Sequence, residues 1–127
     1  MNSNNISKIS DDISKLNNLR ELYINYNQLI ALPDSLGQLT KLKRLYLSEN
    51  KIEYLPDTIG NLLNLVYILL AKNMIKSIPS SIGNLPNLKW LSIDNNNITE
   101  LPATIKNLKS NNCSIYERQS TSLGKRK

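Results

Sequence analysis

Apolar and polar residues along this chain follow a pattern that repeats every 23 residues. In the first period, Leu22 and Ile24 alternate with polar neighbours, which is the spacing of a short β-strand with one buried face. The repeated positions of that period are Leu19, Leu22, Ile24, Asn27, Leu29, Leu32, Pro33, Leu36 and Leu39. The periods that begin at Leu42, Leu65 and Leu88 keep all nine positions without a gap, with leucine and isoleucine interchanging. A fixed period of this length indicates a solenoid of stacked repeats.

Each period predicts a strand, a turn and a return segment, because parallel strands can pair only if the chain crosses back between them. One asparagine follows each strand, and its amide can satisfy backbone groups that the turn leaves unpaired in the core. These structural asparagines are Asn27, Asn50, Asn73 and Asn96. Pro33 and its equivalents then precede a short helical turn on the outer face, with Asp34 and Asp57 in the first turn of two of them.

The repeat resembles the leucine-rich repeat family, whose consensus begins L-x-x-L-x-L-x-x-N-x-L. Its continuation L-P-x-x-I-G-x-L is similar to the intracellular, Ras-group type, which occurs in signalling scaffolds and in plant and protist relatives. The resemblance extends from residue 4 to about residue 108. It implies an α/β solenoid, a right-handed superhelix with a concave parallel β-sheet and short helical or 3-10 turns on the convex side. Because the family is defined by its scaffold, the resemblance implies binding rather than one particular reaction.

The pattern divides the chain into four segments. We interpret residues 1–18 as a partial N-terminal repeat or cap, 19–110 as four repeats, 111–120 as a degenerate C-terminal repeat or cap, and 121–127 as a flexible basic tail. Residues 111–119 are expected to add one more edge strand, and a period of 23 places Ser114 and Tyr116 at its two core positions, where the pattern is lost. At the other end, either residues 4–16 fold over Leu22 and Ile24, or the chain is a piece of a longer array.

The glycines of the return segments, Gly37, Gly60 and Gly83, are expected to adopt a left-handed turn that leads to the next strand. Lys106 replaces this glycine in the fourth period, which indicates that the array is ending.

Strand positions between the buried leucines face the concave side and carry five of the seven aromatic residues. Tyrosine, tryptophan and arginine are enriched at binding hot spots, although aromatic residues also suit strands and pack across an exposed sheet without a ligand. Because they are contiguous, we predict a partner-binding face made of Glu21, Tyr23, Tyr26, Arg44, Tyr46, Tyr67, Leu69, Trp90 and Asp94. Four strands give a patch of roughly 300 Å². A standard interface needs about 800 Å² per partner, so the patch suits a helix, a peptide or a transient contact.

Composition argues against catalysis. The chain has no histidine, which removes the commonest general base and metal ligand, and it lacks the nucleophile and phosphate-binding motifs of common enzymes. Cys113 has no candidate base beside it, and we interpret it as an inert thiol in the capping segment. We therefore predict a protein that is not an enzyme and has no cofactor, no metal and no small-molecule substrate.

Two features bear on the compartment and the partner. The polar start, the single cysteine and the absence of any apolar run near 18 residues predict a cytoplasmic chain without a membrane span, whereas a secreted protein would need an upstream signal segment. The net charge of +6 suggests nucleic acid, but half of it comes from Lys125, Arg126 and Lys127, and no nucleic-acid motif is present.

The function that we predict is a non-catalytic scaffold for intracellular signalling or regulation, a monomer or weak oligomer that binds a protein or peptide through its concave face. The alternatives are a truncated fragment of a larger repeat protein without independent activity and, less favoured, a basic accessory protein that binds nucleic acid.

Overall fold

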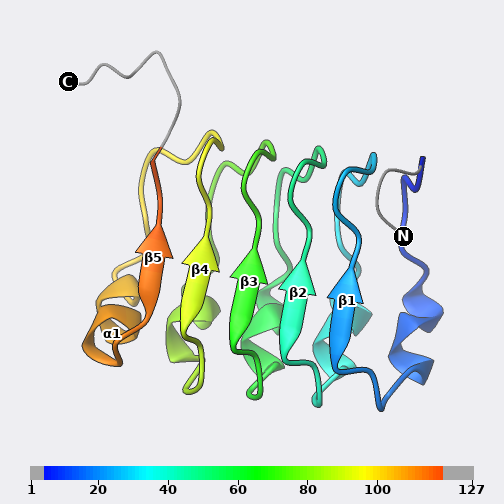
Figure 1. Ribbon diagram of the computed structural model, residues 1–127, viewed down its shortest axis with the longest axis horizontal. Helices are drawn as coiled ribbons and strands as arrows, with labels where there is room; N and C mark the ends of the chain where they lie inside the picture. The colour runs from blue at the N-terminus through cyan, green and yellow to red at the C-terminus, as the bar shows by residue number, and fades with distance from the viewer. Residues whose placement is uncertain (1–4, 119–127) are drawn as a thin grey trace.

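Five three-residue strands lie side by side in chain order and form one parallel sheet on one face of the molecule (Figure 1). The computed structural model describes residues 5–118. The strands are β1 (Glu21–Tyr23), β2 (Arg44–Tyr46), β3 (Tyr67–Leu69), β4 (Trp90–Ser92) and β5 (Ser114–Tyr116). Leu22, Leu45 and Ile68 stand opposite one another, so equivalent residues of successive repeats form columns across the sheet. This arrangement is the solenoid of stacked repeats that the period predicts, with the parallel sheet that the resemblance implies.

Short helices cover the opposite side of the sheet (Figure 1). Four of them are single 3-10 segments, η1 (Asp11–Lys15), η2 (Asp34–Gln38), η3 (Asp57–Asn61) and η4 (Ser80–Asn84), and the fifth is α1 (Ile105–Ser110). Pro33 stands immediately before η2 in an extended conformation, with φ −73° and ψ 151°. Proline suits the start of a helical turn because its fixed φ is already helical and its missing N–H is not needed there. The segments η2, η3 and η4 therefore each begin directly after a proline, and leucine and isoleucine side chains fill the core between these segments and the sheet.

The asparagines after the strands join neighbouring repeats inside the core. Asn73 is buried, and its Nδ2 donates to the carbonyl oxygens of Leu47 at 2.9 Å and Leu70 at 3.1 Å. Its Oδ1 accepts from the N–H of Ile52 at 3.0 Å. Asn50 and Asn96 make the same set of bonds one repeat earlier and one repeat later. One side chain thus satisfies backbone groups of two repeats that water cannot reach.

The prediction that the glycines are left-handed is wrong, because none of Gly37, Gly60 and Gly83 has a positive φ. They are needed for close approach instead: a Cβ built on Gly60 would lie 2.5 Å from the Cβ of Ser81 in the next turn. Four left-handed residues lie one position before the structural asparagines, with φ between 55° and 60°: Tyr26, Glu49, Lys72 and Asn95. A fifth, Asn112, has a φ of 64° and lies between α1 and β5. Lys106 is exposed on α1, and in the described part of the chain no further turn packs against that helix.

At the N-terminal end, residues 5–16 fold over the first strand. Leu22 and Ile24 are only 4% and 2% exposed, and Ile9 is buried with them. The N–H of Ile6 donates to Asn27 Oδ1 at 3.1 Å, and η1 packs against η2, so this segment takes the place of a preceding half repeat. Residues 1–4 of the predicted cap 1–18 lie outside the described residues.

At the C-terminal end, β5 is the expected additional edge strand, but its register differs from the prediction. Leu91 pairs with Ile115, which is 24 residues further along the chain, and the side chain of Ile115 packs against the core. The extra residue lies in the return segment, where the six residues of α1 replace a five-residue 3-10 segment. A shift of one residue moves side chains to the other face of a strand, so Ser114 and Tyr116 lie on the concave side and not in the core. Residues 119–120 of the predicted cap and the basic tail 121–127 lie outside the described residues.

Candidate protein-binding surface

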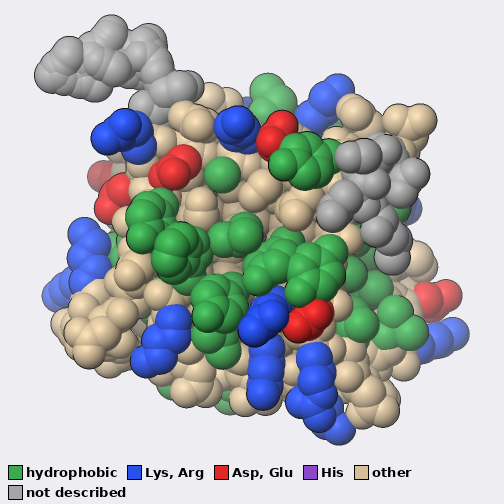
Figure 2. Space-filling view, viewed as in Figure 1, with side chains coloured by type: hydrophobic (Ala, Val, Ile, Leu, Met, Phe, Trp, Pro, Cys, Tyr) green, Lys and Arg blue, Asp and Glu red, His purple; other side chains and the backbone are tan. Residues whose placement is uncertain are grey.

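The outward side chains of the five strands form two adjacent columns, which together we call the concave strip. The first column is Glu21, Arg44, Tyr67, Trp90 and Ser114, and the second is Tyr23, Tyr46, Leu69, Ser92 and Tyr116. Figure 2 shows this strip as a band of hydrophobic side chains across the middle of the sheet face. These residues face outward because successive side chains of a strand point to opposite faces, and the residue between them is a leucine or isoleucine that packs in the core.

Side chains in the first half of the strip hold one another in place. The Tyr23 hydroxyl donates to Glu21 Oε1 at 2.8 Å, and Glu21 Oε2 pairs with Arg44 Nη1 at 3.3 Å. Arg44 in turn places its guanidinium 5.4 Å from the ring centre of Tyr67, and the rings of Tyr23 and Tyr46 meet edge to face at 4.6 Å. The hydrogen bond to the Glu21 carboxylate raises the pKa of the Tyr23 hydroxyl, because it favours the protonated phenol. This half of the strip is therefore largely organised before a partner arrives.

The second half of the strip carries a pair of stacked rings. Trp90 and Tyr116 lie with their ring centres 4.5 Å apart and their planes tilted by 30°. The residues Trp90 and Tyr116 are 37% and 42% exposed. Leu69 on β3 and Ser92 on β4, which precede Tyr116 in the second column, are half-buried. Tyr116 is not among the predicted binding residues because a strict period of 23 places it in the core. Its place could have been found from local alternation, since apolar Ile115 stands between polar neighbours as Leu22 does.

Two of the predicted site residues do not belong to the strip. Tyr26 lies beyond the end of β1 with φ 59° and is 50% exposed. Asp94 follows β4, and its carboxylate Oδ1 accepts from the N–H of Arg118 at 3.0 Å. The structure brings the other seven predicted residues together in the two columns and leaves Tyr26 and Asp94 at the rim, next to the C-terminal ends of the strands.

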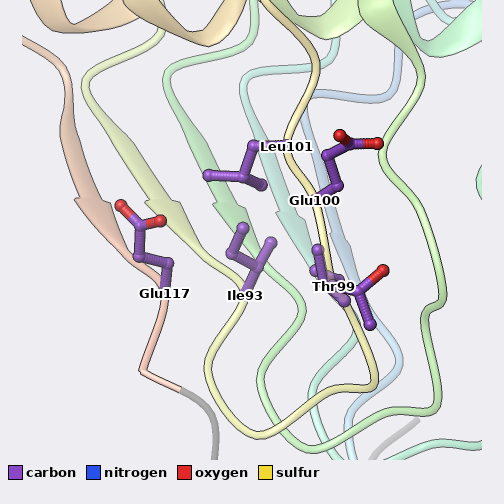
Figure 3. Close-up of a pocket in the computed structure, with 6 residues that line it drawn as sticks. Ile93, Thr99, Glu100, Leu101 and Glu117 are labelled. Atoms are coloured by element: carbon purple, nitrogen blue, oxygen red, sulfur yellow. The ribbon is translucent and has the colours of Figure 1, made fainter.

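A cavity of about 300 Å³ lies between the last two repeats and is lined by Ile93, Ile98, Thr99, Glu100, Leu101 and Glu117 (Figure 3). Its two carboxylates lie on opposite sides of the cavity in Figure 3, and Glu117 pairs with Lys109 at 3.9 Å. The two acids therefore do not form a close pair of the kind used for acid–base chemistry. Within residues 5–118, no cluster of three or more cysteine, aspartate or glutamate side chains could hold a metal ion.

Cys113 is buried, and burial raises the pKa of its thiol, although the nearby Lys89 acts in the opposite direction. A thiol of this kind is mostly protonated at neutral pH and is a weak nucleophile. No helix in residues 5–118 combines the length and hydropathy required to cross a membrane.

Comparison with known proteins agrees with this architecture. Two sequence models of the leucine rich repeat match the chain, one over residues 1–52 and the other over residues 87–108, which is more than half of the chain between them. The chain belongs to the leucine-rich repeat family. No curated protein matches this leucine-rich repeat chain in sequence.

Three solved structures are similar to this chain. A leucine-rich repeat protein of Leptospira interrogans is 34% identical with a TM-score of 0.83, over 91% of this chain and 29% of that one. The ectodomain of the receptor kinase SOBIR1 from Arabidopsis thaliana is 27% identical with a TM-score of 0.78, over 94% and 67%. The plant peptide hormone receptor RGFR1, in complex with RGF2, is 30% identical with a TM-score of 0.76, over 90% and 19%. This chain thus spans less than a third of the first and third of these proteins.

Proposed function

We propose that this leucine-rich repeat chain is a non-catalytic scaffold that binds a partner protein or peptide through its concave strip. The observation that carries the proposal is the strip itself, a contiguous set of aromatic side chains that are partly exposed on the outward face of the sheet. Aromatic side chains supply large contact areas at low cost in conformational entropy, and the contacts among Glu21, Tyr23, Arg44 and Tyr67 reduce that cost further. A related receptor was solved with its peptide, which supports a peptide as one kind of partner.

We further propose a role in intracellular signalling or regulation, a place in the cytoplasm and a monomeric or weakly associating state. The similarity of the repeat to the Ras-group type and the single cysteine support these proposals. The alternative of a fragment gains support from the fraction of the Leptospira protein and of the hormone receptor that this chain spans. In that case the concave strip would be one part of a longer concave surface.

The test compares partner capture by the wild-type chain and by Tyr46→Ala/Trp90→Ala, which removes one ring from each half of the strip. The matched control is Tyr54→Ala/Leu63→Ala, since these side chains are exposed outside the strip. All three proteins must first melt cooperatively at similar temperatures. We expect the wild type and the control to retain the same protein from lysate and the strip variant to lose it. Equal retention by the strip variant would place binding elsewhere on the molecule.

A further inference from the structure

Basic side chains stand along one edge of the concave strip. Arg20, Lys43 and Lys89 are exposed residues that directly precede β1, β2 and β4, and we call them the basic row. Val66 occupies the same position before β3. Figure 2 shows Lys and Arg side chains gathered below the hydrophobic band, with an acidic side chain beside them at the lower edge of the band, and both signs of charge above it. The positive charge on this face is therefore concentrated at the N-terminal ends of the strands.

The carboxylates near this face do not neutralise the basic row. Glu21 is already bound to Arg44 and to the Tyr23 hydroxyl. Glu49 and Asp94 lie beyond the opposite ends of β2 and β4. Among residues 5–118, no ion pair joins Lys43 or Lys89 to a carboxylate. Two ammonium groups beside the strip are thus available to a partner.

Lys43 and Lys89 line one depression of about 320 Å³, together with Val66, Asn64 and Asn87. Both asparagine side chains are fixed by bonds to the preceding repeat: Asn64 Nδ2 donates to Thr40 O at 2.8 Å and Asn87 Nδ2 to Leu63 O at 3.0 Å. The two lysines are two repeats apart, and with a strand spacing of about 4.8 Å their Cα atoms are separated by about 10 Å. One turn of a polyproline II-like peptide, which is three residues, advances by about 9.3 Å.

We infer that the segment recognised by the proposed binding surface is an acidic, extended peptide that crosses the strands along the basic row. Carboxylate side chains about three residues apart pair with Lys43 and Lys89, and the apolar side chains of the peptide pack on the concave strip. This inference rests on the proposed function and specifies the chemistry of the partner. Opposite charge at the edge of an apolar strip fixes the position and direction of the peptide, while the rings supply contact area.

The contacts inside the strip favour a peptide over a nucleic acid. Stacking of bases requires open ring faces. The rings of Tyr23 and Tyr46 already pack against each other, as do those of Trp90 and Tyr116.

The test selects binders from a displayed library of random twelve-residue peptides on the immobilised wild-type chain, then measures the affinity of the selected peptides by fluorescence anisotropy. The first variants are Lys43→Glu/Lys89→Glu and the uncharged Lys43→Gln/Lys89→Gln. The matched control is Lys51→Glu/Lys106→Glu, which makes the same change in net charge at exposed positions away from the basic row. Circular dichroism of each variant establishes that it is folded.

We expect the selected peptides to be enriched in aspartate and glutamate near apolar residues. Charge reversal should weaken their binding by about tenfold or more, the glutamine pair should weaken it less, and the control should stay within about twofold. Peptides without acidic enrichment, or binding unchanged by Lys43→Glu/Lys89→Glu, would overturn the inference. The inference would also be overturned if the wild-type chain selected no peptide from the library but bound a single-stranded DNA of twenty nucleotides.

The same peptides separate this inference from the proposed function. If Tyr46→Ala/Trp90→Ala abolishes binding and the lysine variants do not, the concave strip binds the partner and only the acidic peptide is wrong. If the selected peptides bind Tyr46→Ala/Trp90→Ala as tightly as the wild type, the proposed surface itself is wrong.

Discussion

Replacing Asn73 with leucine tests whether the buried asparagines hold neighbouring repeats together. Leucine has a similar size, so the substitution removes hydrogen bonds without leaving a large cavity. It leaves the Ile52 N–H without a partner and removes one of two side-chain donors to each of the carbonyl oxygens of Leu47 and Leu70. These two oxygens keep the bonds from Asn50 Nδ2 and Asn96 Nδ2. A buried polar group left without a partner costs about 1–3 kcal/mol, and a carbonyl with a second lone pair costs less than an N–H. Loss of one of two hydrogen bonds to a carbonyl costs about 0.5–1 kcal/mol. We therefore expect Asn73→Leu to lower the free energy of unfolding by about 2–5 kcal/mol, a large part of the roughly 5–15 kcal/mol that stabilises a domain of this size.

Urea unfolding followed by circular dichroism and by the fluorescence of Trp90 measures this loss. The control is Asn97→Leu, which makes the same substitution at the exposed neighbour of the last structural asparagine. It should change the free energy of unfolding by less than about 0.5 kcal/mol. Because each repeat contacts only its neighbours, the two signals should separate if Asn73→Leu uncouples the second repeat from the third. A loss below about 1 kcal/mol with one cooperative transition would refute the view that these bonds join the repeats.

Three further predictions concern individual side chains. Gly60→Ala should lower the free energy of unfolding by about 1–3 kcal/mol in thermal or urea unfolding, because its new Cβ meets Ser81 of the next turn; a neutral effect would show that the turns can separate freely. In an alkaline titration followed by tyrosinate absorbance, Tyr23 should ionise later than an unperturbed tyrosine, and Glu21→Gln should lower its midpoint. Because the pKa of Tyr23 is raised on folding, its bond to Glu21 stabilises the fold below about pH 10 and loses that effect as the pH rises through the folded pKa. Cys113 should react with iodoacetamide at pH 8 at least tenfold more slowly in the folded chain than in urea, because burial raises its pKa and restricts access; equal rates would mean that the segment around it opens readily.

Several elements follow from the sequence by local rules. The strands are predictable because Leu22 and Ile24, and their equivalents, alternate with outward-facing residues. The columns of the concave strip follow in turn, because a constant period aligns equivalent residues of neighbouring strands. Seven of the nine predicted binding residues are strand residues and lie in the strip for this reason. Tyr26 and Asp94 come after their strands, and the left-handed backbone of Tyr26 interrupts the alternation there.

The sequence alone therefore determines the repeat, the buried leucine and isoleucine positions and the outward-facing aromatic residues, because these depend on spacing within one repeat. Only the tertiary structure decides what depends on contacts between repeats. Gly60 is a glycine because of Ser81 in the following repeat, and Tyr116 reaches the concave face because one extra residue in the last return segment shifts β5. Lys43 and Lys89 share one depression because the intervening repeat presents a short apolar side chain between them. Such contacts join residues that are about one or two periods apart in the chain. The spacing of residues within one period does not determine how close residues of different periods come in space.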